Sequence, residues 1–261
     1  MFRGRFVAAT PGGGLAAGRC GASTGGKGRA SVPEVSRRFV ILPSPLLGTA
    51  TYAPLAASLT EREAPTAVAS VPDGDVTPER VLAGFRAAVA EHGPTVLVAH
   101  SNAGYYAPAV AADLDLPVIF MDAALPAEGE SETLLAPAAF AEFIQTLPIR
   151  DGLLPLWPLW WDRADIATLF PDEDWLDLVT SEGPRLAPAY FTTPIAVPRG
   201  WEARPAAYLA FGDTYAAELA FAERVGWEVR RESGHHLGHL AEPGRVAELV
   251  LELSSGLSRE T

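Results

Sequence analysis

The residues best suited to chemistry lie in the segment LVAHSNAG, Leu97 to Gly104, where a serine follows a run of apolar residues. Small residues flank Ser101, with Ala99 two positions before it and Ala103 two positions after it. This spacing is typical of a tight strand-to-helix turn that exposes a serine hydroxyl as a nucleophile, above a helix N-terminus that favours negative charge. A serine that merely caps a helix would give the same short pattern.

A serine nucleophile needs a base, and the base needs a carboxylate that orients it. Three histidines stand close together in RESGHHLGHL, at positions His235, His236 and His239. Two aspartates end apolar runs, Asp122 in IFMDA and Asp213 in AFGD. The histidine trio could also suggest a metal, but no carboxylate accompanies it at ligand spacing, so we expect no metal.

Short apolar runs alternate with helical patterns from Phe39 onward, which is typical of a parallel sheet covered by helices. Strands are expected at 39–42, 66–71, 95–100, 117–123, 206–211 and 227–232, and helices at 52–59, 78–92, 102–114, 215–225 and 243–253. Parallel strands end at one edge of a sheet, so Ser101 and both aspartates should meet there. The predicted fold class is α/β, a doubly wound and mostly parallel sheet.

The alternation stops between Leu125 and Pro205, in a stretch rich in Pro, Trp and Leu. Insertions of this length are usually lids or subdomains. We therefore expect a core of residues 38–124 and 205–255, with a helical lid over 125–204 inserted after the strand that ends near Asp122. The aromatic side chains of the lid either bury its own helices or line an apolar pocket above Ser101. The candidates for substrate contact are Tyr105, Phe143, Trp157, Trp160 and Trp161.

The chain has 261 residues, enough for one large α/β domain with its own core, and its single cysteine, Cys20, excludes a disulfide scaffold. The net charge of -12 argues against binding to a phosphate backbone, so nucleic acid is not an expected partner. Apolar runs are too short to span a membrane, and no membrane partner is expected.

Residues 1–37 are basic and rich in Gly and Ala, which predicts a disordered arm. Their apolar pieces are too short for a secretory signal, which favours a cytoplasmic location.

The segment from Ala99 to Ala103 resembles the nucleophile elbow of the α/β-hydrolase superfamily, usually GxSxG, with alanine in place of both glycines. The segment GHHLGHLAEP, which starts at Gly234, resembles the histidine loop of that superfamily. The resemblance extends from about Arg38 to Leu253, and PSPLLG, FMDAALP and LPLW look like runs of actinobacterial proteins described as α/β hydrolases. It implies a Ser-His-Asp triad, a small-molecule substrate and no cofactor.

Within this resemblance, His235 is the expected base because it directly follows Gly234, and His236 and His239 are second choices. The acid usually follows the penultimate strand in a GxxD pattern, and here Tyr215 stands at that position. The acid is then either Asp213 nearby or Asp122, at a place from which haloalkane dehalogenases take theirs. We narrowly favour Asp122.

A tetrahedral intermediate needs two N–H donors for its oxyanion. The resemblance assigns one to the backbone of Asn102 and the other to the loop PSPLLG. Because Pro45 has no N–H, the donor there should be Leu46 or a neighbour.

The expected function is hydrolysis of an ester, thioester or lactone of a small, largely apolar substrate through an acyl-enzyme. Two alternatives remain open. One is a lyase or cyclase of specialised metabolism, in which Ser101 only forms hydrogen bonds. The other is a non-catalytic ligand-binding protein, since a fold alone does not define a function.

Overall fold

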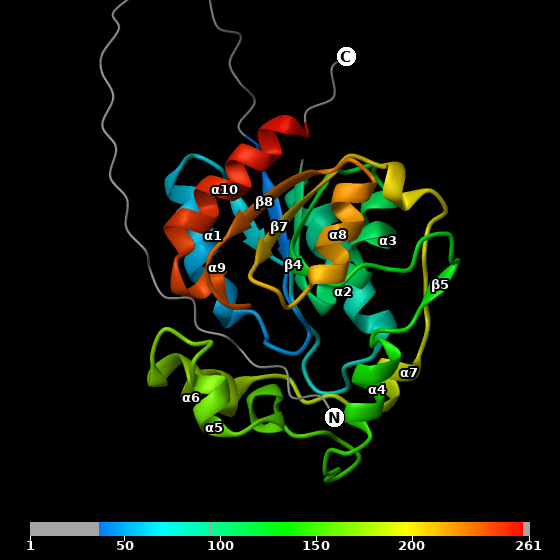
Figure 1. Cartoon of the computed structure of the whole chain (residues 1–261), viewed down its shortest axis with the longest axis vertical. Coiled ribbons are helices and arrows are strands. Elements are labelled where there is room, and N and C mark those ends of the chain that lie inside the picture. Colours follow the sequence, from blue (N-terminus) through cyan, green and yellow to red (C-terminus); the bar gives the residue numbers. More distant parts are fainter. Residues whose placement is uncertain (1–36, 94–95, 258–261) are drawn as a thin grey trace, which may run out of the picture. The chain divides into compact units, whose positions relative to one another are not determined.

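Six parallel strands form the central sheet, in the order β2-β1-β3-β4-β7-β8 (Figure 1). Their bounds are β1 Phe39–Leu42, β2 Thr66–Val68, β3 Val96–Ser101, β4 Val118–Ala123, β7 Ala206–Phe211 and β8 Glu228–Glu232. All residues of β1, β3, β4 and β7 are buried, because these strands are rich in apolar side chains and both faces of the sheet are covered. The predicted doubly wound, mostly parallel α/β fold is confirmed.

The computed structural model describes residues 37–93 and 96–257. The predicted arm therefore lies outside the described residues except for its last position. That position, Arg37, donates hydrogen bonds to the hydroxyls of Ser254 (3.3 Å) and Ser255 (3.0 Å) in α10 (Pro243–Gly256).

Helices cover both faces of the sheet (Figure 1). On one side lie α1 (Ala53–Glu61), α9 (Gly238–Ala241) and α10 (Pro243–Gly256), and on the other α2 (Pro78–His92), α3 (Ala107–Ala112) and α8 (Ala216–Arg224). The predicted start of α2 is confirmed, since the Thr77 side chain accepts a hydrogen bond from the Arg80 N–H. Gly93 ends the helix in the left-handed region at φ 55°.

The segment between β4 and β7 contains short elements only. They are β5 (Glu132–Thr133), α4 (Ala138–Ile144), η3 (Trp157–Trp160), α5 (Arg163–Ala167), α6 (Glu173–Glu182), α7 (Ala189–Thr192), β6 (Ile195–Ala196) and η4 (Trp201–Ala203). The regular elements of the segment are thus mostly helices, joined by long stretches without regular structure, and they include one antiparallel pair, β5 and β6, that the sequence did not predict. Its role as a lid stays a prediction.

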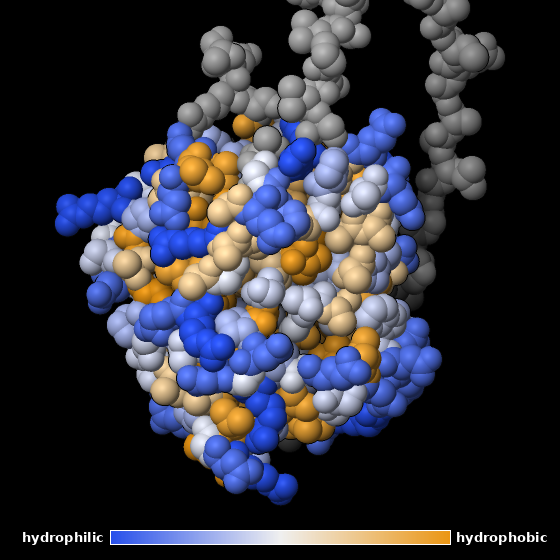
Figure 2. All heavy atoms as spheres, turned by 180° about the vertical axis from the view of Figure 1, so that it is seen from behind, coloured by the Kyte–Doolittle hydropathy of each residue, from blue (hydrophilic) through white to orange (hydrophobic). Residues whose placement is uncertain are grey.

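The outer surface carries both hydrophobic and hydrophilic side chains. Figure 2 shows hydrophobic side chains in separate patches between hydrophilic ones on the face that it presents. No helix within residues 37–93 and 96–257 is both long enough and apolar enough to cross a membrane.

Candidate active site

Ser101 is the last residue of β3 and stands in a conformation that few non-glycine residues adopt, with φ 56° and ψ −129°. The short 3₁₀ helix η2 (Asn102–Tyr105) follows directly, so the backbone turns sharply at the serine. Ala99 and Ala103 are fully buried beside this turn. Small side chains at these two positions let the turn form, as the sequence pattern predicted.

His236 is the histidine that reaches the serine. Its Nε2 lies 3.0 Å from the Ser101 Oγ, and its Nδ1 lies 2.6 Å from Oδ2 of Asp122. A carboxylate can only accept, so Nδ1 carries the proton and Nε2 is free to accept the serine hydroxyl proton. Ser101, His236 and Asp122 together form a continuous hydrogen-bonded relay, and all three side chains are buried.

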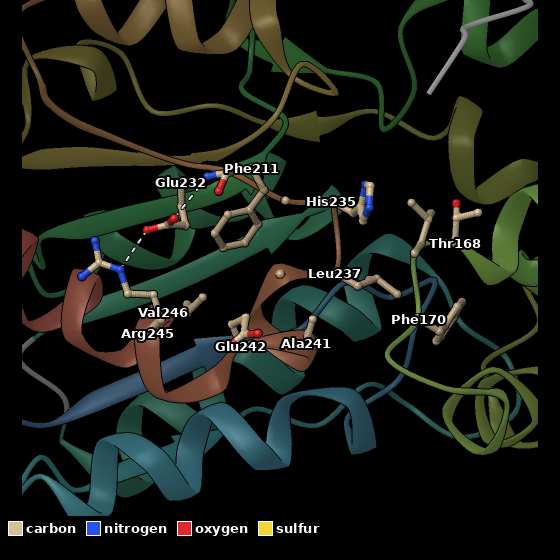
Figure 3. A pocket seen from close by; sticks show the side chains of 14 residues that line it. Thr168, Phe170, Phe211, Glu232, His235, Leu237, Ala241, Glu242, Arg245 and Val246 are labelled. Atoms are coloured by element: carbon tan, nitrogen blue, oxygen red, sulfur yellow. Dashed lines mark hydrogen bonds and ion pairs between the residues drawn. The ribbon is translucent and has the colours of Figure 1, made fainter. Parts of the chain in front are cut away.

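The structure corrects the choice of His235 as the base. His235 is exposed and, with other residues of the histidine loop, lines a cavity of about 400 Å³. In this cavity the His235 side chain extends toward the segment that carries Thr168 and Phe170 (Figure 3). The chain makes a tight turn here, closed by the Gly238 N–H that donates to the His235 carbonyl at 2.8 Å, and of the two adjacent histidines only His236 contacts the serine. The three histidines do not converge on a common point, because His236 faces Asp122 and His239 packs against Tyr52.

Of the two candidate acids, only Asp122 contacts the histidine. Asp122 is fully buried, and its second carboxylate oxygen, Oδ1, accepts the Phe211 N–H at 3.0 Å. Asp213 is exposed in the turn after β7. Two residues farther on, Tyr215 turns inward, and its hydroxyl lies 3.3 Å from the Ser101 Oγ. This contact was not predicted, although the sequence had placed Tyr215 where an acid commonly stands.

A second hydrogen-bonded chain joins the backbone segments that carry the site. The Ser44 N–H donates to the Tyr52 hydroxyl at 2.8 Å, and this hydroxyl lies 2.8 Å from Nδ1 of His100. The His100 Nε2 lies 3.0 Å from the His236 carbonyl oxygen, which can only accept, so Nε2 carries the proton and Tyr52 donates to Nδ1. Tyr52 and His100 thus connect the loop after β1, the serine strand and the histidine loop. Sequence reasoning missed both residues.

Burial keeps two further histidines of this region neutral. His100 is fully buried, and desolvation, aided by repulsion from His239 and His236, lowers its pKa well below the usual value. Burial lowers the pKa of His239 to about 3, with a smaller contribution from His236. Neither ring nitrogen of His239 has a hydrogen-bond partner among the described residues.

The two expected oxyanion donors belong to the loop after β1, which carries Leu46, and to η2, which begins at Asn102. The Leu46 N–H is buried and makes a long hydrogen bond of 3.4 Å to the Ser44 hydroxyl. The Asn102 side chain is occupied elsewhere, because its Nδ2 donates to the Leu135 carbonyl (2.7 Å) and its Oδ1 accepts from the Tyr190 hydroxyl (2.7 Å). These bonds tie the turn to the inserted segment. The role of the two backbone N–H groups in catalysis stays a prediction.

The predicted substrate-contacting aromatics mostly pack against one another. Phe143, Trp157, Trp160 and Trp161 form one aromatic cluster in the inserted segment, with ring centroids 5.2 to 6.4 Å apart. Trp161 is the most exposed of them, at 36%. Tyr105 is buried in η2, next to the serine turn. Their contact with a substrate stays a prediction.

Residues 22–249 match the model of the alpha/beta hydrolase family, and the chain belongs to that family. A comparison with functionally curated proteins gave no match. The fold and the resemblance of the sequence to α/β hydrolases are thereby confirmed.

Three solved structures illustrate which proteins share this fold. An extracellular alpha/beta-hydrolase from a Paenibacillus species, described as sharing homology with tobacco Salicylic Acid Binding Protein 2, has 15% identity and a TM-score of 0.62, and the match covers 83% of this chain and 98% of that one. Tomato methylketone synthase I, complexed with 2-tridecanone, has 11% identity and a TM-score of 0.63, with 86% and 100% covered. The pyrethroid hydrolase PytH has 14% identity and a TM-score of 0.61, with 84% and 97% covered.

Proposed function

We propose that this protein is a serine hydrolase that cleaves a carboxylic ester, thioester or lactone through an acyl-enzyme. The observation that carries the proposal is the buried relay from Ser101 through His236 to Asp122, in which each donor has an acceptor within 3.0 Å. Membership of the alpha/beta hydrolase family supports it. We further propose that the substrate is small and largely apolar, because the inserted segment is rich in aromatic side chains.

The relay specifies where each proton goes. The Ser101 hydroxyl gives its proton to His236 Nε2 while Oγ bonds to the carbonyl carbon and the carbonyl electron pair moves to oxygen. Asp122 accepts the Nδ1 proton in a hydrogen bond and stabilises the imidazolium that forms. The leaving alcohol or thiol takes the proton from Nε2, and water then enters by the same steps and releases the acid and Ser101.

The test compares Ser101→Ala with the wild type on p-nitrophenyl acetate and butyrate. Loss of the nucleophile should lower kcat by about 10⁴-fold or more without unfolding the protein, because one hydroxyl and no core volume is removed. A fluorophosphonate probe should label the wild type and not the variant. Ser233→Ala, which removes an exposed hydroxyl in the histidine loop, serves as the matched control and should keep full activity.

The same probe separates the proposal from its alternatives. A wild type that turns over a substrate without covalent labelling would indicate a lyase or cyclase. A wild type that neither reacts with the probe nor turns over any ester, yet binds a small apolar ligand, would indicate a binding protein.

A further inference from the structure

The hydroxyl of Tyr215 lies 3.3 Å from the Ser101 Oγ, so the nucleophile has a second partner besides His236. Tyr215 is the N-cap residue of α8, at the end of the turn that leaves β7. Its ring centroid lies 5.5 Å from that of His236. The acid of the relay stands on β4 instead, which leaves the place after β7 open for this phenol.

The direction of the bond follows from counting protons. Asp122 holds the Nδ1 proton of His236, so Nε2 must accept, and the single hydroxyl proton of Ser101 goes to it. Ser101 Oγ then has only lone pairs to offer to Tyr215. The phenol is therefore the donor in the contact between the two hydroxyls.

The surroundings of Tyr215 keep the phenol protonated. Burial raises its pKa well above the usual value of 10.0, and the nearby carboxylates Asp122 and Glu218 raise it further, whereas the hydrogen bond to Ser101 acts in the opposite direction. The side chain can therefore act as a hydrogen-bond donor toward Ser101.

We propose that Tyr215 is a further catalytic residue, which donates a hydrogen bond to the Ser101 Oγ when it attacks the substrate carbonyl and when it leaves the acyl-enzyme. In the free protein the donation occupies one lone pair of Oγ and aims the serine proton at His236. As Oγ loses its proton to Nε2, or recovers the electron pair of the breaking C–O bond, negative charge grows on Oγ and strengthens the bond from the phenol. The Tyr215 proton stays on the phenol throughout. This inference rests on the proposed hydrolase function.

The test is Tyr215→Phe, which removes one oxygen and keeps the packed ring. The expected result is a fall of about tenfold to hundredfold in kcat/KM for p-nitrophenyl acetate, the scale of one lost hydrogen bond to a developing charge. The rate constant for labelling by a fluorophosphonate should fall by a similar factor, because that reaction also needs Oγ as the nucleophile. Thr214→Ala, which removes an exposed hydroxyl from the same turn, is the matched control and should change neither rate.

The outcomes separate this inference from the function on which it rests. If the wild type hydrolyses esters and Tyr215→Phe stays within twofold of it, Tyr215 has no catalytic role and the hydrolase proposal stands. If Tyr215→Phe is silent and Tyr215→Ala is inactive, the ring only supports the packing and the inference is overturned. If the wild type shows neither hydrolysis nor labelling, both proposals fail together.

Discussion

Asp122 reaches His236 because the backbone of β4 leaves its regular register at this residue. His100 pairs with Met121, but Ser101 pairs with Ala123, so Asp122 is an extra residue in the strand, with φ 42°. Such a bulge re-aims a side chain. The hydroxyl of Tyr208 stabilises the bulge, since it accepts the Ala123 N–H (3.1 Å) and donates to the Ala123 carbonyl (2.7 Å).

The two aspartates should respond differently to the loss of charge. Asp122→Asn leaves an amide beside Nδ1 that cannot stabilise the imidazolium formed during acyl transfer, so kcat should fall by about 10⁴-fold with KM little changed. Asp213→Asn changes an exposed side chain and should lower kcat by at most a modest factor. Steady-state kinetics of both variants on one ester measure the difference. Equal losses in the two would show that His236 does not depend on Asp122.

At the scale of single residues, the sequence predicted which kinds of residue form the site better than it predicted which side chains contact one another. Ser101 and Asp122 could be predicted because each lies at the C-terminal end of a buried strand, and these ends meet at the same sheet edge. The choice between His235 and His236 could not, because it depends on which of two adjacent side chains a loop turns inward. Tyr215 was visible as a tyrosine in the place of an acid, but its contact with Ser101 depends on the turn geometry.

The element that holds the nucleophile depends on a close approach between η2 and the end of β4. A Cβ added at Gly104 would lie 2.0 Å from the Ala124 carbonyl oxygen and 3.0 Å from the Ala123 Cβ. The backbone at Ala124 is itself fixed, since its N–H donates to the Ser101 carbonyl at 3.1 Å. Only glycine therefore fits at position 104.

Gly104→Ala should destabilise the protein by about 2 to 3 kcal/mol, because a methyl group placed against backbone forces η2 away from β4. Gly244→Ala in the first turn of α10 is the control, since its nearest neighbour would be the flexible end of Arg62 at 3.5 Å. Urea unfolding of both variants provides the comparison. A Gly104→Ala protein as stable as the wild type would mean that the turn can shift without loss.

The elements of the sheet could be predicted more fully than those of the insertion. β1 and β7 have the predicted bounds, because apolar runs flanked by turn residues are strong signals. The expected helix from 102 to 114 divides into η2 and α3, and the expected strand over 66–71 ends at Val68. The insertion is made of pieces of two to ten residues that take their shape from packing, which local patterns do not reveal.

Across the whole molecule, the sheet and the insertion share one hydrophobic core. Trp160 and Phe191 of the insertion belong to the same buried cluster as the strands. The link reaches the site itself, because Tyr190 donates to the Asn102 side chain and accepts from the Tyr106 hydroxyl (2.9 Å). We therefore expect the part of the insertion near Ser101 to stay in place during turnover.

The buried histidines couple the stability of the whole fold to pH. His239 is fully buried between Tyr52 and His100, and the ring of His236 also raises the cost of a charge there. Its pKa of about 3 in the folded protein lies below the usual 6.5, so between these values the unfolded chain binds a proton that the folded protein does not. By linkage, the free energy of unfolding must then fall as the pH falls from 6.5 toward 3, by about 1.4 kcal/mol per pH unit for each such histidine.

His239→Phe should reduce this dependence on pH while keeping a ring stacked on Tyr52. The expected result is a slope of unfolding free energy against pH that is smaller than that of the wild type by about 1.4 kcal/mol per pH unit below pH 6.5. The slope reports only the uptake of protons, because any packing cost of the larger ring lowers the free energy of unfolding by the same amount at every pH. Urea unfolding at several pH values from 4 to 7 measures these slopes, and equal slopes for His239→Phe and the wild type would show that His239 is protonated in the folded protein.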